Sequence, residues 1–105
     1  MIDLDKVEGF DWDTGNARKN EKHGVTQAEA EQVFLSEPLF ITPDEKHSGS
    51  ERRYRALGET AIGRQLTIIF TLRQAGALVR VISARNMNAK ERKLYEQEIK
   101  SNPEI

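Results

Sequence analysis

The sequence has no cysteine, and its 105 residues include only two histidines and one tryptophan. The absence of cysteine excludes disulfide bonds and cysteine-ligated zinc, and it is typical of a cytoplasmic protein. Two histidines are too few for an ordinary structural metal site, so we expect neither a metal nor another cofactor. No hydrophobic run is long enough to cross a membrane, and residues 1–6 are too acidic for a secretion signal. We therefore expect a cytoplasmic protein that does not associate with a membrane.

Repeats and common cofactor motifs are also missing. The chain has no internal repeat, nucleophile elbow, P-loop, dinucleotide-binding fingerprint or metal-binding helix motif. A length of 105 residues is near the common size for one hydrophobic core. We interpret residues 1–105 as a single domain, in which any catalysis must come from ordinary side chains.

The formal net charge of −1 hides an uneven distribution of charge. Residues 1–51 contain five Lys or Arg and twelve Asp or Glu, whereas residues 52–85 contain seven arginines, no lysine and one acid, Glu59. Arginine with few acids nearby suits bidentate recognition of phosphate or carboxylate. The alternative is that these arginines pair with the acids of the N-terminal half. The asymmetry also suits a protein that is neutralised by an acidic partner.

The clearest local pattern is a hairpin between Leu66 and Arg85. Residues 66–73 and 78–85 are rich in β-branched and aromatic side chains, and residues 74–77 form a break of hairpin length. Each strand is apolar enough to be central in a sheet, and each ends in an arginine. Guanidinium groups at the edges of a buried hairpin are therefore the first place to look for function.

Capping patterns predict the helices. Asp13 is a suitable N-cap for a helix that ends at Gly24, with Asn16 on its polar stripe, and Thr26 with Glu29 forms a capping box that opens a second helix. The expected elements are a short strand at 9–13, helices at 13–23 and 26–37, strands at 39–42, 52–59, 65–73 and 77–85, and a helix at 89–100. This order predicts an α+β fold: a small antiparallel sheet of about four to five strands, two N-terminal helices and one C-terminal helix.

The sequence has no cofactor or nucleophile motif, and its polar and charged side chains suit one reaction that needs no cofactor, the transesterification of RNA. In this reaction a base takes the 2′-hydroxyl proton, cations stabilise the charge on phosphorus, and an acid protonates the leaving oxygen. Three alternatives stay open. Each gives a residue a structural role in place of a functional one: His23 caps a helix end, Glu51 forms a salt bridge with Arg53 or Arg55, or Arg85 interacts with a helix.

Several motifs, in order and with compatible spacing, resemble those of the BrnT-type toxins (the DUF497 family). They include Phe10-x-Trp12-Asp13, Lys22-His23-Gly24-Val25, Glu51-x-Arg53-Tyr54, Phe70-Thr71-x-Arg73, and Arg80-Val81-Ile82-Ser83-Ala84-Arg85. The second and the last of these are specific when taken together. The resemblance implies a RelE-like ribonuclease fold and an RNA-cleaving toxin of a bacterial type II toxin–antitoxin pair. It also implies a BrnA-like antitoxin partner with a ribbon-helix-helix domain. The complex would repress its own operon, so operator DNA would be bound only through the antitoxin.

The resemblance also places a set of charged residues on one active face. We predict catalytic roles for Lys22, His23, Glu51, Arg53 and Arg85, and RNA binding by Arg55, Arg73 and Arg80. An undistorted strand would put Arg80 and Arg85 on opposite faces, because their positions differ in parity. A bulge near Ser83, or an Arg85 that lies past the strand end, would place both on one face.

Two other functions fit the same residues. One is a non-catalytic module that only binds an antitoxin-like repressor. The other is a nucleic-acid-binding protein that acts alone, whose affinity for RNA would depend strongly on salt without any turnover.

Overall fold

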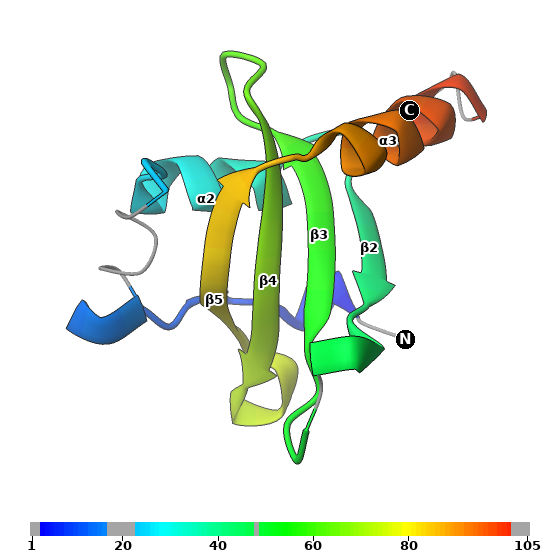
Figure 1. Cartoon of the computed structure of the whole chain (residues 1–105). Coiled ribbons are helices and arrows are strands. Elements are labelled where there is room, and N and C mark those ends of the chain that lie inside the picture. The colour runs from blue at the N-terminus through cyan, green and yellow to red at the C-terminus, as the bar shows by residue number, and fades with distance from the viewer. Residues whose placement is uncertain (1–2, 17–22, 48, 102–105) are drawn as a thin grey trace.

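The computed structural model describes residues 3–16, 23–47 and 49–101 and contains one five-stranded sheet with helices against both faces (Figure 1). The strands are β1 (Gly9–Phe10), β2 (Phe40–Pro43), β3 (Tyr54–Glu59), β4 (Gln65–Arg73) and β5 (Leu78–Asn86). The helices are α2 (Gln27–Phe34) and α3 (Ala89–Ser101), with three short 3-10 turns, η1 (Leu4–Lys6), η2 (Glu45–His47) and η3 (Gln74–Gly76). The predicted α+β class is confirmed.

The sheet order is β1-β5-β4-β3-β2. The β2, β3, β4 and β5 strands form the expected antiparallel run, but β1 pairs with β5 in parallel, so the sheet is mixed and the prediction of a wholly antiparallel sheet is wrong. The N-terminal strand joins the far edge of the sheet rather than its sequence neighbour, a choice that local patterns do not specify. The helix expected at 13–23 is helical at residues 14–16, and its remainder falls on residues 17–22, outside the described residues.

A bulge in β5 decides which side chains share a face. Ile69 pairs with Ser83 and Phe70 pairs with Val81, so the register skips Ile82. The residues buried on the α2 side are accordingly Val79, Val81 and Ala84, which an undistorted strand could not present together. The predicted bulge near Ser83 is thus confirmed, and Arg80 and Arg85 lie on the same face, opposite α2.

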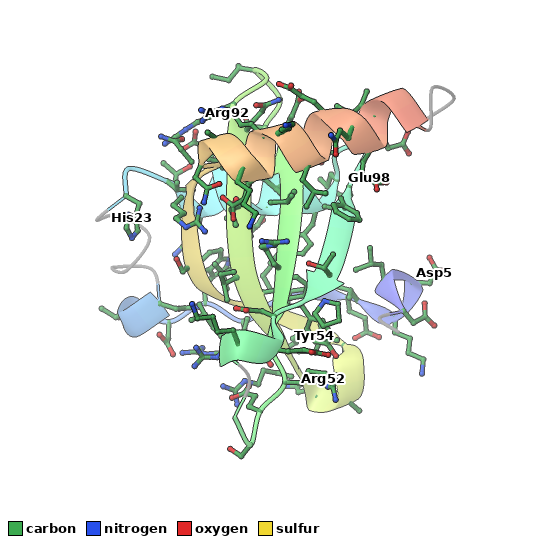
Figure 2. The ribbon with its side chains drawn as sticks, turned by 45° about the vertical axis from the view of Figure 1, so that its right-hand side comes forward. Asp5, His23, Arg52, Tyr54, Arg92 and Glu98 are labelled. Carbon is green, nitrogen blue, oxygen red and sulfur yellow. The ribbon has the colours of Figure 1, made fainter. Side chains whose placement is uncertain are left out.

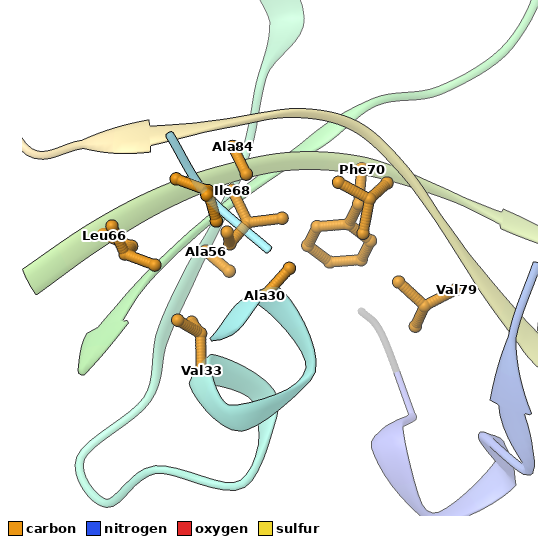
Figure 3. Packing of buried hydrophobic residues seen from close by; sticks show 10 residues of the cluster. Ala30, Val33, Ala56, Leu66, Ile68, Phe70, Val79 and Ala84 are labelled. Carbon is orange, nitrogen blue, oxygen red and sulfur yellow. The ribbon is translucent and has the colours of Figure 1, made fainter. Parts of the chain in front are cut away.

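The main core lies between this sheet and α2 (Figure 3). Ala30 and Val33 of α2 pack on Ala56, Ile68 and Phe70, all fully buried. Thr26 and Glu29 form the predicted capping box at the start of α2, and the helix ends at Phe34, before Pro38. Burial of this apolar face, rather than helix propensity in eight residues, stabilises so short a helix.

A smaller core lies under α3 on the other face. Tyr95 of α3 is buried with Leu57 and Met87, and its hydroxyl donates a hydrogen bond to the Pro38 carbonyl oxygen at 3.0 Å. Burial, with a contribution from Glu59, raises the pKa of Tyr95 to about 12, so this hydroxyl stays protonated and structural. Figure 2 shows that α3 crosses only one end of this face. No helix in the described part of the chain is long and apolar enough to span a membrane.

Candidate functional site

Four of the eight predicted site residues line one pocket on the sheet face opposite α2. Glu51 and Arg53 precede β3, Arg73 ends β4 and Arg80 lies near the start of β5, so three neighbouring strands bring them to one end of the sheet. The pocket has a volume of about 340 Å³, and Asn16 and Ile82 form part of its wall. Arginines from separate strands therefore converge where an extended polyanion could lie.

Carboxylates already contact two of these arginines. Arg73 lies 3.2 Å from Glu51, and both side chains are close to half exposed, at 45% and 41%. Arg80 lies 2.8 Å from an oxygen of Asp13 and 3.4 Å from one of Asp11. The backbone N–H of Asn16 and the Arg80 guanidinium hold the pKa of Asp13 below its ordinary value. The alternative in which arginines pair with N-terminal acids is thus realised in part, and the charge of the described pocket is nearly balanced.

Asn16 has a structural role in the site, and the prediction that it lies on the polar stripe of a helix is wrong. It is buried at 5% exposure, not on a polar surface stripe. Its amide nitrogen donates to the carbonyl oxygens of Asp11 at 3.0 Å and Val81 at 3.2 Å, and its oxygen accepts the N–H of Asp13 at 2.7 Å. Asn16 thereby fixes the segment carrying Asp11 and Asp13 against the bulged part of β5. The reciprocal Asp13-x-x-Asn16 spacing of a capping motif is the signal that could have indicated this.

Arg85 and Arg55 lie beside another carboxylate, that of Glu91, at the α3 end of the same sheet face. Glu91 is buried at 4% exposure and accepts two hydrogen bonds from Arg85, at 2.7 and 3.0 Å. It also accepts bonds from the Thr67 hydroxyl and the Asn88 backbone N–H, and Arg55 lies 3.8 Å away. Burial raises the pKa of Glu91, but the hydrogen bonds from Arg85, Asn88 and Thr67 outweigh it and hold this pKa below its ordinary value. Arg85 therefore binds helix α3 through Glu91, which is the structural role stated above as the alternative to catalysis.

His23 is the remaining predicted site residue in the described part of the chain, and it lies outside the arginine pocket. His23 is exposed in the turn before α2, well separated from Arg52 and Tyr54 in Figure 2, and it does not line the arginine pocket. Lys22 lies outside the described residues. A larger pocket of about 700 Å³ on the α2 side of the sheet, lined by Leu39, Ile41, Arg52 and Tyr54 among others, is mostly apolar and contains none of the predicted site residues. The arginine pocket is therefore the better candidate for chemistry.

The paired carboxylates predict the response of stability to acid. The pKa values of Glu91, Glu29 and Asp13 are all lowered in the folded chain, so each favours folding above its unfolded pKa and loses that contribution as it is protonated. We expect the free energy of unfolding to fall as the pH drops below about 4.3, the ordinary value of Glu. Urea denaturation at several pH values measures this. Glu91→Gln should show a weaker loss between neutral and acid pH, and an acid slope equal to that of wild type would contradict the role of Glu91.

Comparison with known families matches residues 12–91 to the family described as the ribonuclease toxin, BrnT, of type II toxin–antitoxin system. The matched range runs from Trp12 to Glu91 and contains all eight predicted site residues, the bulge, Asp13 and Glu91. No curated protein matches the sequence.

Proposed function

Because the chain belongs to the BrnT family of ribonuclease toxins of type II toxin–antitoxin systems, we propose that it cleaves RNA by metal-independent transesterification at the arginine pocket. The observation that carries this proposal is the convergence of Glu51, Arg53, Arg73 and Arg80 in one pocket of about 340 Å³. A carboxylate beside several guanidinium groups supplies a base and phosphate-binding charge in one place.

In the proposed reaction the 2′-oxygen of one ribose attacks the adjacent phosphorus and the bond to the 5′-oxygen breaks. Glu51 accepts the proton of the 2′-hydroxyl. Arg53 and Arg73 bind the non-bridging phosphate oxygens, where negative charge grows in the transition state. The products are a 2′,3′-cyclic phosphate and a 5′-hydroxyl. The leaving oxygen takes its proton from an acid, for which Lys22, outside the described residues, remains our predicted candidate, whereas His23 does not line this pocket.

The contact between Glu51 and Arg73 is weak enough for the Glu51 carboxylate to be released, so that it can accept the proton of the 2′-hydroxyl. Their 3.2 Å contact joins two side chains that are nearly half exposed, and such pairs contribute roughly 1 kcal/mol or less. A phosphate oxygen can replace the carboxylate on Arg73 at little cost, which leaves Glu51 beside the bound ribose. We assign Arg80 a positioning role, because Asp11 and Asp13 already bind it.

The family implies a protein partner that neutralises the toxin. We propose a BrnA-like ribbon-helix-helix antitoxin, a complex that represses its own operon and contacts operator DNA only through the antitoxin, and a cytoplasmic location. A non-catalytic, antitoxin-binding module is the second candidate. The carboxylates on Arg80 and Arg85 favour it, because they occupy two cations that an RNA-cleaving site would otherwise use.

The test is cleavage of RNA by the purified protein in excess EDTA. We expect fragments that end in 2′,3′-cyclic phosphate and 5′-hydroxyl groups. Glu51→Gln keeps the shape of the side chain but removes the base, and should lower the cleavage rate about 100- to 10,000-fold. Its fold can be checked by thermal denaturation, since an exposed side chain such as Glu51 contributes little to stability. Intact RNA with wild-type protein, in the presence and absence of ribosomes, would favour the non-catalytic module.

A further inference from the structure

A second pocket on the same face is lined by more cations than carboxylates. It has a volume of about 320 Å³, lies between β3 and the first turns of α3, and is lined by Arg55, Lys90 and Lys93 together with Glu91 and Gln97. The lysines are exposed, whereas Glu91 is buried and already binds Arg85 through two hydrogen bonds. Three cations therefore face this pocket with one carboxylate, which binds Arg85 and lies 3.8 Å from Arg55.

The lysines have no evident structural role. Neither Lys90 nor Lys93 forms an ion pair with a residue in the described part of the chain. They lie three positions apart on α3, a spacing at which like charges repel by a few tenths of a kcal/mol. This arrangement costs stability unless an anion binds between them.

The two pockets are adjacent along one strand. Arg53 of the arginine pocket immediately precedes β3, and Arg55 of the second pocket is the second residue of that strand. Their Cα atoms are therefore about 7 Å apart in extended backbone, and both side chains lie on the same face. A single-stranded RNA that places one phosphate at Arg53 can continue along this face to the lysines without bending away from the sheet.

We propose that Arg55, Lys90 and Lys93 form a subsite that binds a phosphate flanking the cleaved bond of a single-stranded RNA. This inference rests on the proposed ribonuclease function and extends it. The arginine pocket is nearly charge-balanced, so the net attraction for the RNA backbone comes from this neighbouring subsite. The arginine pocket then acts on the phosphate that the subsite places there.

The test uses a short single-stranded oligoribonucleotide in which every 2′-hydroxyl is methylated, because it keeps the phosphates but lacks the attacking group. Binding of the full chain is measured over a range of salt concentrations. Loss of this one phosphate contact in the Lys90→Ala/Lys93→Ala variant should reduce the magnitude of the slope of log affinity against log salt by about 0.7. Lys90→Arg/Lys93→Arg should keep the wild-type slope, as should Lys6→Ala, which removes a lysine from η1.

The outcomes separate this inference from the function on which it rests. If wild type cleaves RNA but the alanine variant binds the analogue with an unchanged slope, the subsite is refuted and the ribonuclease function stands. If the variant keeps RNA binding but escapes antitoxin, the pocket serves a protein partner and the RNA assignment is wrong. If wild type neither binds the analogue nor cleaves RNA, both proposals fail. A lower slope with unchanged thermal stability supports the subsite, because exposed lysines on a helix add little to folding.

Discussion

Arg53→Ala is expected to lower the rate of RNA cleavage about 100- to 1,000-fold, the usual loss when one donor to a developing anion is removed. Arg53 lines the pocket with Glu51 and Arg73, and its position just before β3 holds it beside the ends of β4 and β5. Its backbone carbonyl accepts the N–H of Asp44 at 2.9 Å, a contact that alanine keeps. Single-turnover cleavage in EDTA measures the effect on the chemical step.

The neighbouring Arg52 provides a matched control. It is exposed and lines the large apolar pocket rather than the arginine pocket. Arg52→Ala removes the same charge one residue away, so we expect cleavage within a few-fold of wild type. Equal losses in the two variants would mean that the arginines act only through the general attraction of RNA, and the proposed chemistry at Arg53 would be wrong.

Arg85→Ala is expected to reduce the free energy of unfolding by about 2 to 3 kcal/mol, because it leaves the buried carboxylate of Glu91 without its main partner. We place the loss below that of a fully buried pair because the Arg85 side chain is 35% exposed and solvent screens it. Glu91 would keep its bonds from Thr67 and Asn88, with Arg55 at the edge of contact. Urea denaturation at neutral pH measures the loss.

A paired replacement then separates structure from catalysis at this position. Exchanging a buried ion pair for apolar side chains of similar volume is often neutral for stability, so Arg85→Met combined with Glu91→Leu should recover part of the loss, because Thr67 and Asn88 lose their acceptor. If the stable double variant also cleaves RNA, Arg85 has no catalytic role. If it folds but is inactive, the predicted catalytic role of Arg85 is supported. Stability unchanged in Arg85→Ala would contradict our account of the Arg85–Glu91 pair.

This distinction matters for any assay of toxicity in cells. Arg85→Ala would restore growth either by removing a catalytic group or by unfolding the protein, since a loss of 1–2 kcal/mol can change abundance several-fold. Arg53→Ala and Glu51→Gln are cleaner tests, because both residues line the arginine pocket and the Glu51 side chain is 41% exposed.

The sequence by itself determined the elements whose signals lie between near neighbours. The apolar alternation of β4 and β5 and the Thr26–Glu29 capping box each depend on residues a few positions apart. Such signals work because side-chain direction and helix capping are set by local backbone geometry. The same local order carries the family resemblance. The parity conflict between Arg80 and Arg85 left two alternatives, a bulge near Ser83 or an Arg85 past the strand end, and the strand pairing shows the bulge.

Only the tertiary structure decided which charges meet. Asp13 and Arg80 are 67 positions apart, and Asn16 and Val81 are 65 apart, yet each pair forms a hydrogen bond. The parallel addition of β1 to β5 brings the N-terminal acids beside Arg80, and the packing of α3 on the sheet brings Glu91 to Arg85 and Arg55. A guanidinium binds whichever carboxylate the fold places within about 4 Å, and no local rule of sequence specifies that neighbour.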